Sequence, residues 1–252
     1  MKISIITICY NNEKDIRPTL ESVINQTYHN IEYIIVDGVS KDKTLEIINE
    51  YKYKITKIIS ESDNGLYDAI NKGIKSATGD VVGLIHAGDK LHDNEVIAKI
   101  ATHFEENDID IAYGYSKTIN QNGKCIRINK SPEYEKWLVK YGWMPSHQSI
   151  YIKRDVFNKY GYYDLDFHPF ADYELFIRFF YFNDLKVKLI KDYILYFSLG
   201  GTSTGSIVNS LKWRNLIYKA WEKNGRKAPK FLSITKFLWR FTMWYNALIF
   251  NK

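Results

Sequence analysis

The sequence has few cysteines and no long apolar run. Cys9 and Cys125 are the two cysteines in 252 residues, which excludes a disulfide scaffold and a thiolate zinc cluster. No stretch of 18 apolar residues occurs, so we expect no membrane-spanning helix. The apolar run Ile3–Tyr10 is short and no cleavage site follows it, so we expect no signal peptide and a cytoplasmic location. Hydrophobic residues at 45% and charged residues at 25% exclude a disordered or collagen-like chain.

Charge is distributed unevenly along the chain. The net charge is +6, but residues 211–252 contain ten of the 35 Lys and Arg and one of the 29 acids, a net +9. Residues 1–210 therefore carry −3. Four of the six Trp also lie in residues 211–252. This asymmetry predicts a catalytic or binding body at 1–210, followed by a basic helical tail that seeks a surface.

Apolar strands alternate with amphipathic helices in the first 115 residues, which predicts an α/β fold with a mostly parallel, Rossmann-like sheet. Ligands of such sheets bind beyond the carboxyl ends of the strands. The predicted strands are 3–10, 32–37, 55–60, 80–85 and 109–115, and the predicted helices are 15–28, 42–51, 66–77 and 93–106.

The regular alternation stops near residue 116, and a small antiparallel element is expected there. Asn122-Gly123 predicts a hairpin turn. Strands are expected at 147–152, 187–190 and 193–197, and an amphipathic helix at 172–182.

Acidic residues follow several of the predicted strands. Asp37 either accepts hydrogen bonds from a nucleotide or only turns the chain. Asp89 either holds Mg²⁺ or Mn²⁺ against substrate phosphates or occupies a turn, and nearby His86 is either a ligand or a satisfied structural residue. Asp63 and Asp68 either bind sugar hydroxyls or cap the helix at 66–77.

The ordered segments ISIITICYNN, SVINQTYHNIEYIIVDGVSKDKT, SESDNGLYDAINKGIKSATGD and GLIHAGD resemble a family 2 glycosyltransferase of the GT-A fold, in a branch from bacterial polysaccharide gene clusters. The resemblance covers roughly residues 1–182. It implies a nucleotide-diphospho-sugar donor, most often a UDP-sugar, inversion at the anomeric carbon, and a divalent metal, Mn²⁺ or Mg²⁺. Residues 1–115 would then form the nucleotide-sugar half and 116–210 the acceptor half.

The resemblance also assigns donor-side residues. It makes Asp37 the base-recognition residue and Asp89 the metal ligand; His86, Gly38 and Gly88 depart from the family's usual acids. The remaining donor-side positions are Thr7, Cys9, Tyr10, Asn11, Asn71, Lys72 and Gly88, with Asp63 and Asp68 beside them.

On the acceptor side, MPSHQSIYIKRDVFNKYGYYDLDFHPFADYELFIRFF resembles the family's second half. Asp172 falls on the position of the catalytic base, although the start of a helix also suits it as a cap. Glu174 is the second candidate base. His147 and Gln148 lie on a stretch that borders the active site in this branch.

The basic tail predicts an amphipathic helix with Ile234, Leu238, Phe241, Tyr245 and Leu248 on one side. It either lies in an anionic membrane interface or packs on the body or on a second subunit. The family context suggests a saccharide or polyprenyl-diphosphate-linked acceptor at the inner face of the membrane, and transfer of a single sugar.

Other functions would need motifs that this sequence lacks or would leave its carboxylates unexplained. A nucleotidyltransferase needs a Gly-rich basic loop after the first strand, and a dinucleotide oxidoreductase needs G-x-G-x-x-G; neither motif is present. A nucleic-acid-binding module would use the basic tail but would leave Asp37, Asp89 and Asp172 unexplained. A catalytically silent sugar-nucleotide-binding protein stays open on sequence grounds. Because nucleic-acid binding would leave these three carboxylates unexplained, we expect no nucleic-acid partner.

Overall fold

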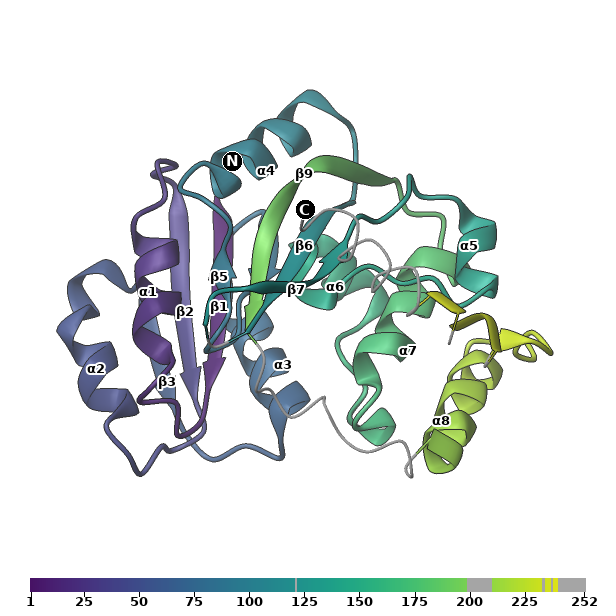
Figure 1. The fold of residues 1–252 in the computed structure, drawn as a ribbon, viewed down its shortest axis with the longest axis horizontal. Coiled ribbons are helices and arrows are strands. Elements are labelled where there is room, and N and C mark those ends of the chain that lie inside the picture. Colours follow the sequence, from purple (N-terminus) through teal and green to yellow (C-terminus); the bar gives the residue numbers. More distant parts are fainter. Residues whose placement is uncertain (121, 199–209, 233, 237, 240–252) are drawn as a thin grey trace.

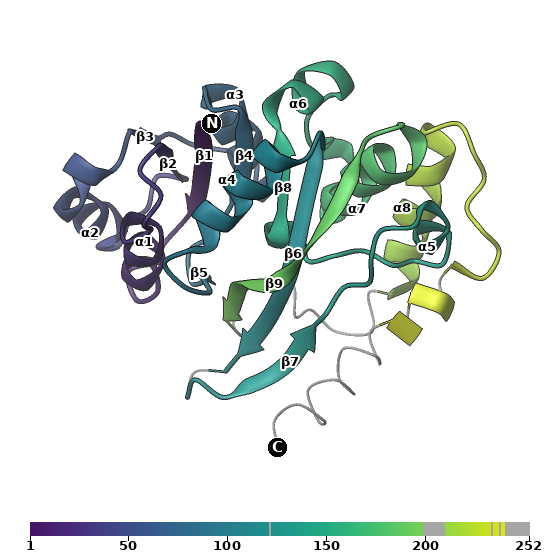
Figure 2. The same cartoon turned by 90° about the horizontal axis from the view of Figure 1, so that it is seen from above.

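One nine-stranded sheet lies between two layers of helices (Figures 1 and 2). The computed structural model describes residues 1–120, 122–198, 210–232, 234–236 and 238–239. The strands are β1 (Ile3–Cys9), β2 (Ile31–Asp37), β3 (Lys57–Ser60), β4 (Val81–Leu84), β5 (Lys90–Leu91), β6 (Ile111–Ile119), β7 (Cys125–Asn129), β8 (Ile150–Lys153) and β9 (Val187–Ser198).

The helices are α1 (Ile16–Ile24), α2 (Thr44–Glu50), α3 (Leu66–Ser76), α4 (Val96–Glu106), α5 (Lys136–Lys140), α6 (Arg154–Tyr160), α7 (Ala171–Ile177) and α8 (Ser210–Lys223). Short turns of 3₁₀ helix are η1 (Lys52–Lys54), η2 (His147–Ser149) and η3 (Leu165–Phe167), and η4 (Arg178–Phe182) is a π-helix.

The sheet order β3-β2-β1-β4-β8-β6-β9-β5, with β7 beside β6, confirms the predicted mostly parallel α/β sheet. β1 to β4 pair in parallel, and β6 and β9 run in the same direction as they do. β5, β7 and β8 run antiparallel to this set. The carboxyl ends of β1, β2, β3 and β4 therefore meet at one edge, as expected for a ligand site.

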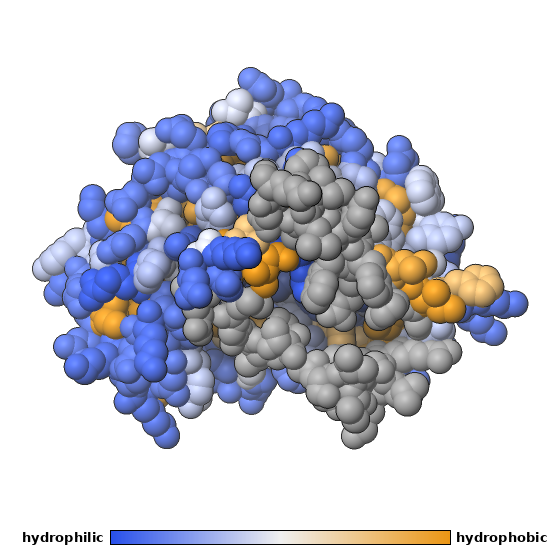
Figure 3. Space-filling view, in the orientation of Figure 1, coloured by the Kyte–Doolittle hydropathy of each residue, from blue (hydrophilic) through white to orange (hydrophobic). Residues whose placement is uncertain are grey.

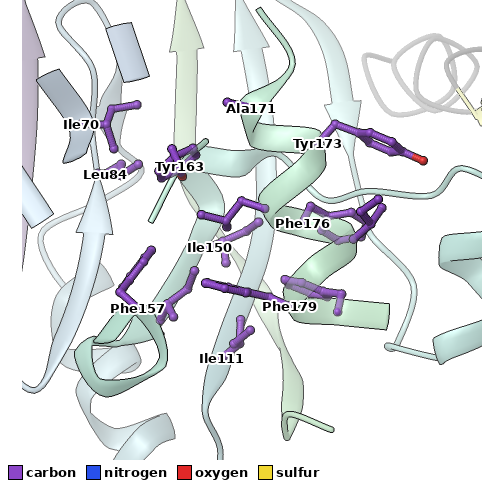
Figure 4. Packing of buried hydrophobic residues seen from close by; sticks show 14 of the residues in the cluster. Ile70, Leu84, Ile111, Ile150, Phe157, Tyr163, Ala171, Tyr173, Phe176 and Phe179 are labelled. Carbon is purple, nitrogen blue, oxygen red and sulfur yellow. The ribbon is translucent and has the colours of Figure 1, made fainter. Parts of the chain in front are cut away.

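Alternation along the strands separates two cores. In β2, Ile34 and Val36 face a core shared with α3, α6 and α7, whereas Tyr33 and Ile35 face a core shared with α1, α2 and α4. Figure 4 shows the first core, in which Phe176 and Phe179 of the α7–η4 segment pack toward Ile150 and Ile111 of the central strands. Burial of both sheet faces explains the nearly continuous apolar strands.

Four predicted elements differ in detail. The strand expected at 147–152 begins as η2, and only Ile150–Lys153 is strand, inserted antiparallel between β4 and β6. The strands expected at 187–190 and 193–197 are one strand, β9, because a register shift against β6 absorbs the residues between them. The helix expected at 172–182 is α-helical to Ile177 and continues as η4.

The start of the tail packs against α7. In α8, Trp221 is buried and its indole N–H donates to the Tyr173 hydroxyl at 2.9 Å. Leu232 is also buried in the same core. The tail positions Phe241, Tyr245 and Leu248 lie outside the described residues.

No helix in the described parts of the chain is both long enough and apolar enough to cross a membrane.

Candidate active site

Two loops are joined at the carboxyl edge of the parallel strands. The backbone N–H of Asn11 donates to the Ser40 hydroxyl at 2.9 Å, and the Asn11 side-chain oxygen accepts from the Lys41 N–H at 2.8 Å. Asn11 has φ +52°, a left-handed conformation that asparagine tolerates better than most residues. This pairing fixes the loop that follows β1 and leaves the Tyr10 ring 57% exposed.

Asp37 is fully buried at the end of β2. Its two oxygens accept from the Ser40 N–H at 3.0 Å, from the Ser40 hydroxyl, and from the Ser60 hydroxyl at 2.8 Å. The Cys9 thiol also lies 3.7 Å from Asp37, and burial and this carboxylate raise the pKa of the thiol. The predicted nucleotide contact of Asp37 therefore requires one of these donors to turn away.

Tyr10, Gly38 and Asp63 lie close together beside Asp37. A Cβ atom on Gly38 would come within 2.8 Å of the Asp63 carboxylate and 3.3 Å of the Tyr10 ring. Glycine at this position therefore allows a carboxylate and an exposed aromatic ring to approach the same stretch of backbone. Asp63 also accepts from the Gly65 N–H at 2.9 Å, which fixes the turn before α3.

The other donor-side residues on α3 have protein partners. Asp68 accepts from the Asn64 N–H at 2.9 Å, in the turn before α3. Lys72 lies 3.1 Å from Glu61 and 3.6 Å from Asp68. Asn71 is buried and exchanges two hydrogen bonds with the backbone of Tyr163, at 2.8 and 3.0 Å, so it joins the two halves of the chain. Thr7 is buried and bonds to the Tyr33 hydroxyl at 3.0 Å.

Asp89 lies beyond β4, with 7% of its surface exposed. Burial raises the pKa of its carboxyl to about 6, although the Ser198 N–H at 2.9 Å and the Gln148 side chain partly counteract this. Gly88 beside it has φ +99°, which glycine adopts without strain. Its N–H donates to the Thr19 hydroxyl at 3.0 Å.

The surroundings of Asp89 fit a divalent cation. Within the described residues no Lys or Arg pairs with this buried carboxylate, so a cation would supply the missing compensation. A single carboxylate oxygen is also the kind of ligand that Mg²⁺ and Mn²⁺ prefer when substrate phosphates complete the shell. No group of three or more His, Cys, Asp or Glu able to hold a metal occurs in the part of the chain that the structure describes.

Two neighbouring residues of η2 link Asp89 to Asp172. Gln148 hydrogen-bonds Asp89, and its side-chain oxygen accepts from the His86 backbone N–H at 2.9 Å. His147 Nδ1 lies 4.0 Å from Asp172 Oδ2. The candidate metal ligand and the candidate base are 83 positions apart in sequence, and η2 brings them to the same site.

Asp172 lies in the first turn of α7 with two unequal oxygens. Its Oδ1 accepts from the Tyr67 hydroxyl at 3.1 Å and from the Tyr173 N–H at 2.8 Å. Its Oδ2 faces His147 at a distance too long for a hydrogen bond. Oδ2 is therefore the oxygen with room to accept a proton.

Glu174 lies on the buried side of α7. Its carboxylate accepts from the Arg178 guanidinium at 2.8 to 3.3 Å and from the Asn224 side chain at 3.0 Å. Arg178 also donates to the backbone oxygens of Tyr160 and Tyr162. This ion pair joins α7 to the segment after α6 and to α8, and it leaves Asp172 as the better placed base.

Sequence reasoning did not select Tyr67 or Ser198. Tyr67 is 105 positions from Asp172, and Ser198 is 109 positions from Asp89. Tyr67 stands in the segment SESDNGLYDAINKGIKSATGD, which carries the resemblance, but its contact with Asp172 and that of Ser198 with Asp89 form only in the folded chain.

Comparison with known proteins identifies the family of this chain. A model of glycosyl transferase family 2 matches residues 4–165, more than half of the chain. The chain belongs to glycosyl transferase family 2.

Curated relatives of this family 2 chain include a PGL/p-HBAD biosynthesis glycosyltransferase of Mycobacterium tuberculosis, 30% identical over 163 residues. That alignment covers 63% of this chain and 62% of the relative, so the chain spans less than two thirds of its length. An uncharacterized glycosyltransferase of Methanocaldococcus jannaschii is 28% identical over 202 residues, covering 77% of this chain and 69% of that protein.

Solved structures confirm the GT-A fold expected for a family 2 chain. Residues 1–349 of S. aureus TarS superpose with a TM-score of 0.69 at 20% identity, covering 94% of this chain and 71% of that one. The mannosyltransferase PcManGT of Pyrobaculum calidifontis gives a TM-score of 0.65 at 14% identity, covering 98% and 74%.

Proposed function

We propose that this protein is an inverting glycosyltransferase that moves one sugar from a nucleotide-diphospho-sugar, first of all a UDP-sugar, to a saccharide acceptor. The observation that carries the proposal is the link through η2. Gln148 contacts Asp89 on the donor side, and its neighbour His147 approaches Asp172 on the acceptor side. Both carboxylates thus border one site at the carboxyl edge of the sheet.

The donor would lie along the carboxyl ends of β1 to β4. The exposed Tyr10 ring offers a flat surface for a nucleobase, and the Asp63 carboxylate lies close to it on the other side of Gly38. TarS has been solved with UDP and with UDP-GlcNAc, and PcManGT with GDP-Man and Mn²⁺. These complexes support a nucleotide-sugar donor of this class for the present chain.

A divalent metal would be held by Asp89 together with phosphate oxygens of the donor. When bound, it would offset the negative charge that develops on the leaving nucleoside diphosphate. Asp89 would supply an oxygen ligand that Ser198 and Gln148 hold in place.

Asp172 would serve as the base of a direct displacement. The acceptor hydroxyl gives its proton to Asp172 Oδ2 as its oxygen attacks the anomeric carbon from the face opposite the nucleotide. The bond between the anomeric carbon and the phosphate oxygen breaks, and the nucleoside diphosphate leaves. The Tyr67 hydroxyl and the Tyr173 N–H hold Oδ1, which turns Oδ2 toward the acceptor.

We further propose that the acceptor is lipid-linked and that the protein works at the cytoplasmic face of an anionic membrane. Residues 232, 234–236 and 238–239 are helical. Phe231, Ile234 and Leu238 are 69%, 61% and 56% exposed on one side of this segment, and Figure 3 shows hydrophobic atoms gathered at the right of the molecule, where Figure 1 draws the C-terminal segment.

The other side of this segment lies on the acceptor half. Lys236 lies over the ring of Tyr173, with its Nζ 3.6 Å from the ring centroid, and Tyr173 follows the candidate base. A membrane contact through Phe231, Ile234 and Leu238 would therefore hold the acceptor side close to the lipid surface. Arg226, Lys227 and Lys230 nearby are exposed, a charge that attracts anionic lipid and opposes pairing with a second copy.

Nucleotide binding tests the donor proposal. Thermal unfolding is followed with UDP, GDP and dTDP, each with and without Mn²⁺, and release of nucleoside diphosphate is then measured from the matching sugar donors. We expect UDP with Mn²⁺ to give the largest stabilisation. No shift with any nucleotide would contradict the proposed donor site.

Vesicle flotation tests the membrane proposal. Vesicles of phosphatidylcholine with phosphatidylglycerol should bind the protein more strongly than phosphatidylcholine alone, and the double substitution Ile234→Asp with Leu238→Asp should abolish this. Tyr53→Asp changes an 89% exposed side chain outside the patch and serves as the control. Equal flotation of both variants would reject the patch, and a dimer in solution that the double substitution disrupts would assign it to a second copy.

A further inference from the structure

Two histidines from distant segments meet beside the candidate base. His86 Nε2 lies 3.1 Å from His147 Nε2, with ring centroids 5.3 Å apart. The bond from the His86 backbone N–H to the Gln148 side chain ties the same two segments together. His147 also lines, with Asp172, a small and mostly apolar cavity. The pair is therefore a built contact between the loop after β4 and η2.

Both histidines are neutral near pH 7. The two Nε2 atoms are 3.1 Å apart, which leaves room for one proton between them, and the buried Nδ1 of His86 has no acceptor among the described residues, so a charged ring does not suit His86. Burial lowers the pKa of His147, although the Asp172 carboxylate opposes this. Two neutral rings joined through a pair of nitrogens share one proton there, so one ring donates and the other accepts.

The charge of Asp172 selects one of the two arrangements. If His86 Nε2–H donates, the proton of His147 is on Nδ1 and points toward Asp172 Oδ2, 4.0 Å away. If His147 Nε2–H donates instead, the lone pair of Nδ1 faces the carboxylate oxygen. The first arrangement is attractive and the second repulsive, since a carboxylate only accepts hydrogen bonds.

The far nitrogen of His86 selects the same arrangement independently. His86 Nδ1 is buried and has no hydrogen-bond partner among the described residues. In the first arrangement this nitrogen carries no proton, whereas in the second it would be a buried N–H donor with no acceptor. A buried donor without a partner is costly, so the proton belongs on His86 Nε2.

We propose that His147 is a positioning residue for Asp172 and that His86 fixes its tautomer: His86 Nε2–H donates to His147 Nε2, which directs His147 Nδ1–H at Asp172 Oδ2. The catalytic part of this inference rests on the proposed role of Asp172 as the base. The N–H favours the ionised carboxylate and leaves space for an acceptor hydroxyl. His86 stands where the family often has an acid, and here it acts on the base Asp172 by fixing the tautomer of His147.

Nuclear magnetic resonance tests the tautomers without any substrate. Long-range ¹H–¹⁵N correlation spectra of the ¹⁵N-histidine-labelled full chain at pH 7 should show His147 protonated at Nδ1 and His86 at Nε2. The resonances are assigned by their loss in His147→Asn and His86→Gln. A His147 ring protonated at Nε2, or a charged ring at either position, would overturn the proposal.

Matched variants test the function of the pair. An Asn amide occupies the place of Nδ1 and a Gln amide that of Nε2, so His147→Asn keeps the donor toward Asp172 and His147→Gln loses it. The assay is release of nucleoside diphosphate from whichever of UDP-GlcNAc, UDP-glucose or GDP-mannose the wild type turns over with Mn²⁺. We expect His147→Gln to lower kcat about tenfold or more, with KM for the donor unchanged and His147→Asn within about threefold of wild type.

The variants at His86 should reproduce this division. His86→Gln keeps a donor at the place of Nε2 and should resemble the wild type, whereas His86→Leu should resemble His147→Gln. His29→Gln, at an exposed position, is the control. If His147→Asn and His147→Gln lowered kcat equally, or if only KM changed, the positioning role would be rejected. Full turnover by Asp172→Asn would instead refute the proposed base and leave the tautomer result standing.

Discussion

Two buried carboxylates at opposite edges of the parallel sheet, Glu32 and Asp89, have opposite environments. At the amino-terminal edge, Glu32 accepts from the hydroxyls of Ser4 and Thr78 and from the Lys2 ammonium at 2.5 to 2.9 Å. Burial alone would raise its pKa, but these hydrogen bonds outweigh burial and lower it to about 2. At the carboxyl-terminal edge Asp89 has few donors, and burial raises its pKa to about 6.

This difference separates a structural acid from one suited to a ligand. Glu32 is satisfied by the chain itself, so its charge stabilises the fold. Asp89 is ionised at neutral pH at a cost to the fold, and a bound cation would remove that cost. The comparison predicts that removing the two charges has opposite effects on stability and on binding.

Asp172→Asn should give the largest effect on the carboxyl-terminal side. The amide cannot take the acceptor proton, so turnover should fall by about 100-fold or more. The free energy of unfolding should change little, since an amide oxygen can still accept from Tyr67 and Tyr173. Nucleoside diphosphate release and urea unfolding check the two halves of this prediction; unchanged release would assign the base elsewhere.

Asp89→Asn should abolish Mn²⁺-dependent stabilisation by UDP. Without metal, the same variant should be roughly 2 kcal/mol more stable than the wild type at pH 8, because an uncompensated charge is removed while the bond from Ser198 N–H is kept. Thermal unfolding with and without Mn²⁺ and UDP measures both effects. If the metal-free variant were less stable than the wild type, the Asp89 charge would stabilise the fold as the Glu32 charge does.

Glu32→Gln should act in the opposite sense. Loss of the charge leaves the Lys2 ammonium and several hydroxyl and N–H donors with a weaker acceptor, so the free energy of unfolding should fall by roughly 2 kcal/mol. Stabilisation by UDP with Mn²⁺ should persist. If Glu32→Gln were as stable as the wild type, the Glu32 charge would not stabilise the fold and the contrast with Asp89 would fail.

The smallest expected effect is on how the free energy of unfolding depends on pH. Glu32 has a lowered pKa in the folded protein, so its contribution is complete above about pH 4.5 and is lost as the pH falls toward about 2. Asp89 has a raised pKa, so its cost is absent below about pH 3.8 and complete above about 6. Urea unfolding from pH 3 to 8 measures the free energy of unfolding of each protein. The difference between wild type and Glu32→Gln should rise with pH below about pH 4.5, and the difference between wild type and Asp89→Asn should fall as the pH rises toward about 6 and beyond.

Local sequence patterns predicted the elements of residues 1–115 closely. The strands around Ile3–Cys9 and Ile31–Asp37 and the helix at Leu66–Ser76 appear near their expected bounds, because continuous apolar runs and helical spacing report burial directly. Patterns were weaker after residue 116. There β8 is inserted antiparallel between strands from elsewhere in the chain, and no local signal gives such an order.

By itself, the sequence determined the α/β class, the carboxylates at the strand ends and the charge division between body and tail. These follow from periodicity and composition, which are properties of neighbouring residues. Only the tertiary structure decided that the Asn224 side chain donates to Glu174, that Tyr67 holds Asp172, and that His86 meets His147. Those roles depend on contacts between residues many positions apart, and packing rather than local pattern brings them together.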